Sequence, residues 1–90
     1  MPPSDDEFAS LFKLLAAPAR VRIVRLLRNR ALCVGALSKR LDITQGAVSQ
    51  HLRALRDGGL VTADKRGNFV HYRLNGKTVE QFRRVFDDVF

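Results

Sequence analysis

The chain has 90 residues, of which 46% are hydrophobic and 28% charged, and its formal net charge is +7. This length predicts one domain over residues 1–90, and no apolar run approaches the roughly 18 residues that a membrane-spanning helix needs. The N-terminal residues lack the basic and apolar segments of a signal peptide, and the single cysteine excludes an intrachain disulfide. We therefore expect a protein of the reducing cytoplasm that does not contact a membrane.

Two helices are predicted in the first third of the chain. Ser4 and Glu7 form the pattern of a capping box at the start of the first helix. Apolar residues then recur at the helical spacing i, i+3, i+4 and i+7, namely Phe8, Leu11, Phe12 and Leu15. Pro18 suits the first turn of the second helix, which is predicted over residues 19–29.

A pair of helices with a tight connection comes next. The first of them is predicted over about Val34–Leu41 and the second over residues 45–57, with Thr44 as its N-cap. Gly58 and Gly59 follow as a helix stop signal. Val48, Leu52 and Leu55 recur at i, i+4 and i+7, so we expect them to face the core.

The pattern then changes to that of a β-hairpin. Two runs rich in Val, Thr, Phe and Tyr flank the predicted turn at residues 65–68. A final helix is predicted over residues 77–90, with Val85 at the edge of its apolar face. The members of that face are Val79, Phe82, Phe86, Val89 and Phe90.

This order of elements predicts a mainly α-helical fold with a small β-hairpin, the winged helix–turn–helix. The helix over residues 45–57 is the expected reader of DNA bases, through Gln45, Ala47, Ser49, Gln50 and Arg53. The DNA backbone is the expected partner of Lys39, Thr44, Lys65, Arg66 and Asn68. Gly46 either allows close approach to DNA or is only tolerated near a helix end.

Positive charge supports a nucleic-acid partner. Residues 13–77 hold most of the chain's 16 Lys and Arg residues, whereas both ends of the chain are mildly acidic. A concentrated basic surface suits double-stranded DNA, because each neutralised phosphate releases counterions. Taken alone, the same charge would also fit a well-solvated surface.

Residues 8–75 resemble the ArsR family of winged-helix repressors. The resemblance rests on the Pro-Ala-Arg-x-x-Ile opening of the second helix, Leu32-Cys33-Val34, "QGAVSQHLRALRDGGLV" and a wing that ends in Val70, His71, Tyr72 and Leu74. It implies a repressor that binds a pseudo-palindromic operator as a homodimer. It also implies that the dimer forms through the first and last helices.

The terminal helices favour a dimer independently of the resemblance, because so small a domain can hardly cover two apolar stripes itself. The residues expected at the interface are Phe8, Leu11, Phe12, Leu15, Val79, Phe82, Phe86, Val89 and Phe90. The alternative is that both stripes pack onto the rest of the same chain.

The family's thiolate metal site would lie at Cys33. Gly35 stands where the family motif has its second cysteine, and Ala31 and Ala36 replace its acidic residues. Soft metals need several thiolates, so we expect neither a metal nor another cofactor. A second family site uses Asp and His on the last helix, which has Asp87 and Asp88 but no His. His51 and His71 are expected to be structural or to contact DNA.

Cys33 has two interpretations, a small hydrophobic core residue, which we favour, or a reactive thiol. The sequence does not identify an effector. It shows no nucleophile–base pair and no phosphate loop, so we expect no enzyme. A winged helix used for protein interaction remains an alternative, but the face that would read DNA lacks the apolar anchors of such a surface.

Overall fold

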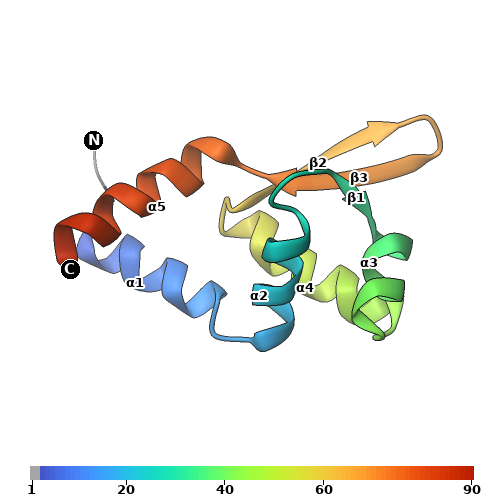
Figure 1. Ribbon diagram of the computed structural model, residues 1–90, viewed down its shortest axis with the longest axis horizontal. Helices are drawn as coiled ribbons and strands as arrows, with labels where there is room; N and C mark the ends of the chain where they lie inside the picture. The colour runs from blue at the N-terminus through green and yellow to red at the C-terminus, as the bar shows by residue number, and fades with distance from the viewer. Residues whose placement is uncertain (1–2) are drawn as a thin grey trace.

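A computed structural model describes residues 3–90. The elements in chain order are α1 (Asp5–Leu14), α2 (Pro18–Leu26), β1 (Leu32–Cys33), α3 (Val34–Leu41), α4 (Gln45–Asp57), β2 (Val61–Arg66), β3 (Phe69–Leu74) and α5 (Gly76–Val89). Figure 1 shows α1 and α5 together at one end of the molecule, and α3 with the hairpin turn at the other. The predicted winged helix–turn–helix is confirmed, with the short strand β1 as an addition. No helix within residues 3–90 is long and apolar enough to cross a membrane.

The helix starts follow the predicted capping chemistry. The Glu7 amide donates to Ser4 Oγ over 3.2 Å, and Pro18 occupies the first turn of α2. Helices α3 and α4 have the predicted bounds. Helix α2 ends at Leu26, earlier than the predicted residue 29, because the chain turns at Leu27, where the backbone leaves helical geometry.

The core lies where α2, α3 and α4 meet the start of the hairpin. Val48, Leu52 and Leu55 are at most 1% exposed, so the prediction that this face of α4 points inward is confirmed. The remaining core members are Ile23, Leu27, Leu37, Leu60 and Val61. Burial of this face fixes the rotation of α4 about its axis, and the polar side of α4 therefore faces solvent.

The sheet has three antiparallel strands in the order β1-β3-β2. Strand β1 pairs Leu32 with Tyr72 and Cys33 with His71. Strands β2 and β3 are joined by Gly67 and Asn68 alone, and Gly67 has a φ of 60°. A two-residue loop with a positive φ at its first position is the pattern of a type II′ turn, which suits the twist of a hairpin. The turn is thus shorter than the predicted 65–68.

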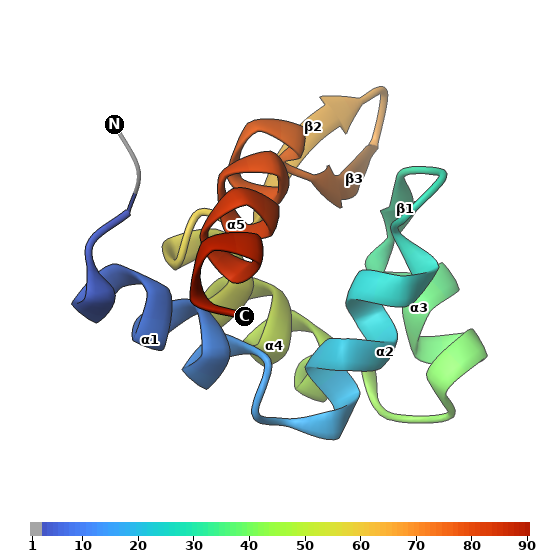
Figure 2. The same ribbon diagram turned by 60° about the vertical axis from the view of Figure 1, so that its left-hand side comes forward.

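Helices α1 and α5 lie next to each other (Figure 2), and aromatic rings of the two helices are in contact. The ring centroid of Phe8 lies 4.8 Å from that of Phe12 and 5.2 Å from that of Phe82, both in edge-to-face geometry. Val85, predicted at the edge of the apolar face of α5, is the buried residue of that helix. The two terminal helices therefore form one layer beside the helix–turn–helix of α3 and α4.

Candidate nucleic-acid interface

The turn between α3 and α4 is held by local contacts. The Ser38 hydroxyl donates to the Ile43 carbonyl, and the Ile43 amide donates to the Ser38 carbonyl over 3.3 Å. Asp42 takes a left-handed conformation with a φ of 55°, which short polar side chains tolerate better than other non-glycine residues. These contacts fix where α4 begins relative to α3.

The outer face of α4 is polar along its whole length. Thr44 caps the helix, because its Oγ1 accepts from the Ala47 amide over 3.1 Å. Of the predicted base-reading residues, Ala47 is half-buried and the other four are exposed. The exposed positions of α4 are Gln45, Gly46, Ser49, Gln50, Arg53, Arg56 and Asp57. None of them is a large apolar residue of the kind that anchors a protein partner.

Three of the predicted base-reading residues share one groove between α4 and the sheet. Ser49, Gln50 and Arg53 line this groove of about 650 Å³ together with Arg56 and Tyr72. Arg56 was missed in the sequence, although its position three residues after Arg53 places both on one helical face. Gln45 and Ala47 belong to the first turn of α4 and do not line the groove.

Gly46 has no packing reason to be a glycine. A Cβ atom at Gly46 would lie 3.9 Å from Thr44 Oγ1, which is an ordinary van der Waals contact. Its φ is not in the left-handed region, where glycine is favoured. Because glycine weakens a helix by about 1 kcal/mol relative to alanine, the chain itself gains nothing from it here.

The hairpin turn presents basic and apolar side chains together. Lys65, Arg66 and Asn68 are exposed, as is Lys39 on α3. Phe69, the first residue of β3, is 63% exposed and was not singled out in the sequence, where it read as an ordinary strand residue. An exposed aromatic ring beside two cations is a combination found in proteins that contact the DNA minor groove.

Arg20 links three helices next to this surface. Its Nε donates to His51 Nδ1 over 3.2 Å, and its Nη1 donates to the Leu14 carbonyl over 3.5 Å. His51 is thus a structural acceptor on α4, one of the two predicted roles. This role of Arg20 could not be predicted from local sequence, because His51 lies 31 positions away in the chain.

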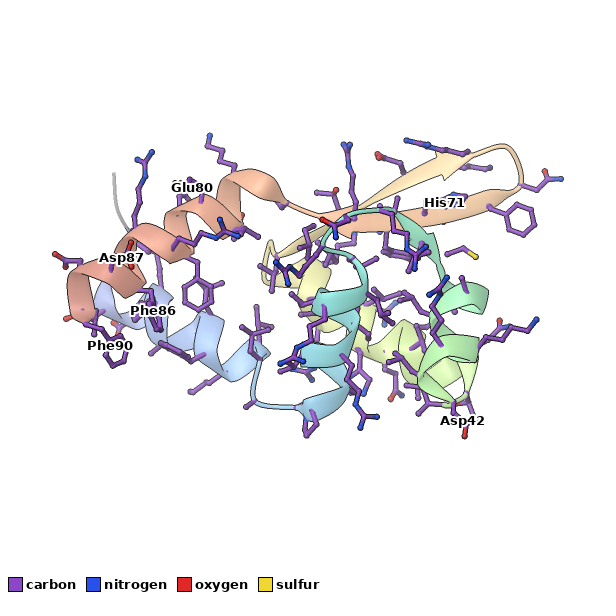
Figure 3. The ribbon with its side chains drawn as sticks, in the orientation of Figure 1. Asp42, His71, Glu80, Phe86, Asp87 and Phe90 are labelled. Atoms are coloured by element: carbon purple, nitrogen blue, oxygen red, sulfur yellow. The ribbon has the colours of Figure 1, made fainter. Side chains whose placement is uncertain are left out.

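Cys33 is only partly buried and is not one of the fully buried core residues. The choice between a small hydrophobic residue and a reactive thiol stays a prediction. The residue is half-buried, ends β1 and is the N-cap residue of α3. Its cross-strand neighbour His71, labelled in Figure 3, has a buried Nδ1 without a hydrogen-bond partner among the described residues. Within residues 3–90, no group of three or more His, Cys, Asp or Glu side chains could hold a metal ion.

A second surface, on α1 and α5, is apolar. Phe12, Phe86, Val89 and Phe90 are between 43% and 83% exposed, and Figure 3 shows Phe86 and Phe90 together near the end of α5. A groove of about 430 Å³ beside them is lined by Leu15, Val79 and Phe82, among others. Phe8 and Leu11, the other two residues predicted for a dimer interface, are buried within the single chain.

Comparison with known proteins adds to this description. Residues 17–63 match the family described as "Bacterial regulatory protein, arsR family". The chain is 44% identical over 69 residues to the HTH-type transcriptional repressor SmtB of Mycobacterium tuberculosis, covering 77% of this chain but only 51% of that repressor. It is 40% identical over 81 residues to the arsenical resistance operon repressor of Escherichia coli, covering 89% of this chain and 69% of the relative.

Comparison with solved structures agrees with the sequence matches. The homodimeric winged helix–turn–helix DNA-binding domain of Mb0332 from Mycobacterium bovis, a possible ArsR-family regulator, superimposes with a TM-score of 0.78 at 30% identity. The match covers 97% of this chain and 86% of that domain. The matched family and relatives are regulators and not enzymes, in agreement with the prediction.

Proposed function

Because the chain belongs to the ArsR family of bacterial regulatory proteins, we propose that it is a transcriptional repressor that binds a pseudo-palindromic operator as a homodimer. The observation that carries this proposal is the shared groove of Ser49, Gln50 and Arg53 on the polar face of α4. Gln pairs with adenine and Arg with guanine, so this groove suits base edges in the major groove. Since bacterial operators lie in the cytoplasm, we expect the protein to act there.

The proposed contacts divide between base reading and backbone binding. Gln45, Ala47, Ser49, Gln50 and Arg53 read bases, and Arg56 joins them at the far end of the groove. The backbone contacts come from Lys39, Thr44, Lys65, Arg66 and Asn68. Thr44 lies at the N-terminus of α4, where free amides and the helix dipole favour a phosphate.

A selection of bound DNA from a random pool identifies the operator and tests base reading. On the selected site, Gln50→Ala is expected to weaken binding by about 1–3 kcal/mol, because a paired hydrogen bond to a base is lost. On a scrambled site of equal length the loss is expected to be small. Equal losses on both sites would refute the assignment of Gln50 to base reading.

Contacts from the wing, the hairpin of β2 and β3, are expected to change the salt dependence of DNA affinity and not its sequence specificity. Lys65→Ala is expected to weaken binding to all sequences and to lower the slope of log affinity against log salt by about 2, because the homodimer loses one phosphate contact in each subunit. Lys77→Ala removes the same charge outside the wing and is the matched control, with an unchanged slope. An unchanged slope in Lys65→Ala would remove Lys65 from the interface.

The operator complex of this proposal does not depend on a thiolate metal site. One thiol per chain, with Gly35 beside it, supplies too few soft ligands. In a DNA-binding assay, arsenite, zinc and cadmium are therefore expected to leave the complex intact. Release of DNA by any of them at stoichiometric concentration would contradict this part of the proposal.

A second candidate function, release of DNA by modification of Cys33, is favoured by one observation. The half-buried thiol is the N-cap residue of α3, so an adduct there would push on the first turn of the helix–turn–helix. Alkylation with iodoacetamide in the native state, followed by a DNA-binding assay, tests it, with Cys33→Ser as the control. If the native protein is not alkylated, or if the alkylated protein binds DNA unchanged, this candidate fails.

A further inference from the structure

Five arginine residues from the hairpin, α5 and the segment before β1 line one cavity. Arg28 and Arg30 come from the segment between α2 and β1, Arg66 and Arg73 from the hairpin, and Arg83 from α5. The cavity has a volume of about 570 Å³. No acidic side chain lines it, although three separate parts of the fold contribute to its wall.

Most of this positive charge is uncompensated. Arg73 forms an ion pair with Asp64, with 3.1 Å between Nε and Oδ2, and its Nε donates to Thr62 Oγ1 over 3.3 Å. The other four arginines form no ion pair with any carboxylate within residues 3–90. Like charges around a concave surface repel one another and raise the local potential, so a bound anion would stabilise this arrangement.

The floor of the cavity differs from its rim. Leu27, Leu74 and Val79 also line the cavity and are more buried than its five arginines, which are all exposed. The volume falls within the range of small-molecule sites, which combine an apolar lining with a few placed polar groups. Guanidinium groups bind phosphate in bidentate geometry, and their flat faces also stack on aromatic rings.

We propose that this cavity binds a small organic anion that carries at least two phosphate groups on an apolar or aromatic body, of which a nucleoside diphosphate is the simplest example. The phosphates would contact Arg28, Arg30 and Arg83, and the body would lie on the aliphatic floor. The DNA backbone shares the phosphate chemistry but fits the position less well. Arg73, Leu74 and Gly76 line the cavity from the end of the hairpin opposite its turn and from the start of α5, whereas Arg66 lies directly before the turn.

Arg66 gives the site a regulatory consequence, which rests on the proposed function. Arg66 lines the cavity and is also a proposed wing contact to DNA. If the ligand, besides its contacts to Arg28, Arg30 and Arg83, also engages Arg66, it withdraws Arg66 from the DNA backbone, and ligand and DNA are then expected to weaken each other's binding by the same factor.

Calorimetric titration of the DNA-free protein with adenosine 5′-diphosphate and with pyrophosphate tests the site. The double variant Arg30→Ala/Arg83→Ala removes two cavity arginines and no proposed DNA contact. Arg25→Ala/Arg84→Ala removes the same charge from α2 and α5, at positions that do not line the cavity, and is the control. Salt near 0.15 M limits unspecific attraction, because the Debye length is then about 8 Å.

The native protein and the control are expected to bind both adenosine 5′-diphosphate and pyrophosphate. In comparison titrations, adenosine 5′-diphosphate is expected to bind more tightly than adenosine 5′-monophosphate or adenosine. The double variant is expected to bind at least about tenfold more weakly, as the loss of bidentate phosphate contacts implies. Absence of binding by the native protein, or equal weakening in both variants, would overturn the site. Weakened binding of random-sequence duplex in Arg30→Ala/Arg83→Ala alone, without nucleotide binding, would assign the cavity to DNA instead and also overturn it.

Discussion

At position 46, alanine would favour the stability of the chain, whereas glycine would favour the proposed close approach to DNA. Nothing in the structure requires a glycine there, and an exposed glycine in a helix is unfavourable. Gly46→Ala is therefore expected to raise the free energy of unfolding by up to about 1 kcal/mol. If the backbone at Gly46 approaches DNA closely, the same substitution weakens operator binding. Chemical denaturation and a DNA-binding titration of one sample measure both effects.

Gly76→Ala is the matched control for this prediction. Gly76 also lies in the first turn of a helix, and a Cβ atom there would meet nothing within 4 Å. It is expected to raise stability similarly and to leave operator binding unchanged. A Gly46→Ala protein that binds its operator as tightly as the native protein would show that Gly46 is only tolerated.

At the scale of elements, α4 depends on a contact that no sequence pattern reveals. Arg20 holds α4 through His51 and also reaches the end of α1. Arg20→Met keeps the aliphatic stem but loses both hydrogen bonds, so it is expected to lower the free energy of unfolding by about 1 kcal/mol. Arg22→Met, at an exposed position of the same helix, is the control and is expected to change it by less than about 0.5 kcal/mol.

Urea denaturation of the two variants measures the difference between them. Equal stability of Arg20→Met and Arg22→Met would mean that the hydrogen bond to His51 contributes no net free energy. A lower operator affinity in Arg20→Met alone would show in addition that the contact helps to orient α4.

The sequence predicted those elements whose boundaries carry local chemistry. Thr44, Pro18 and the Ser4–Glu7 pair mark helix starts, and all three act as expected. The end of α2 has no glycine or proline to mark it, so periodicity alone extended the helix too far. Strand β1 has two residues, too few for an alternating pattern, and exists only because β3 pairs with it.

Site prediction divides in the same way. Positions on the outer face of α4 follow from helical periodicity once its core face is known, so the residues of the DNA groove were largely predictable. The partial burial of Cys33 and the exposure of Phe69 could not be predicted in this way, because both depend on how the sheet packs. The arginine cavity joins parts of the chain up to 55 positions apart, between Arg28 and Arg83.

At the scale of the whole molecule, the exposed face of α1 and α5 is expected to carry the dimer. Phe86 is 46% exposed and contacts Phe90, with ring centroids 4.7 Å apart. Phe86→Glu places a charge in this apolar face and is expected to weaken dimerisation by about 2 kcal/mol or more. Sedimentation velocity over a concentration series measures the shift to the monomer.

Phe69→Glu is the matched control, since Phe69 is an exposed aromatic residue on the wing. It is expected to leave the sedimentation coefficient unchanged and to weaken DNA binding. A Phe86→Glu protein that remains dimeric would move the interface away from α5. Circular dichroism of both variants distinguishes dissociation from unfolding.

The pairing of β1 with β3 also fixes the distance between the helix–turn–helix and the hairpin turn. Helix α3 starts at the residue after β1, so the helix–turn–helix and the hairpin are attached to one sheet and keep a constant separation. Each residue added to both strands would advance the turn by about 3.3 Å, close to the rise of one base pair. If α4 and the hairpin turn contact DNA as proposed, the length of the hairpin sets the number of base pairs between their contacts in one subunit. A longer half-site is then expected to require insertions in β2 and β3, and not changes in the proposed base-reading residues.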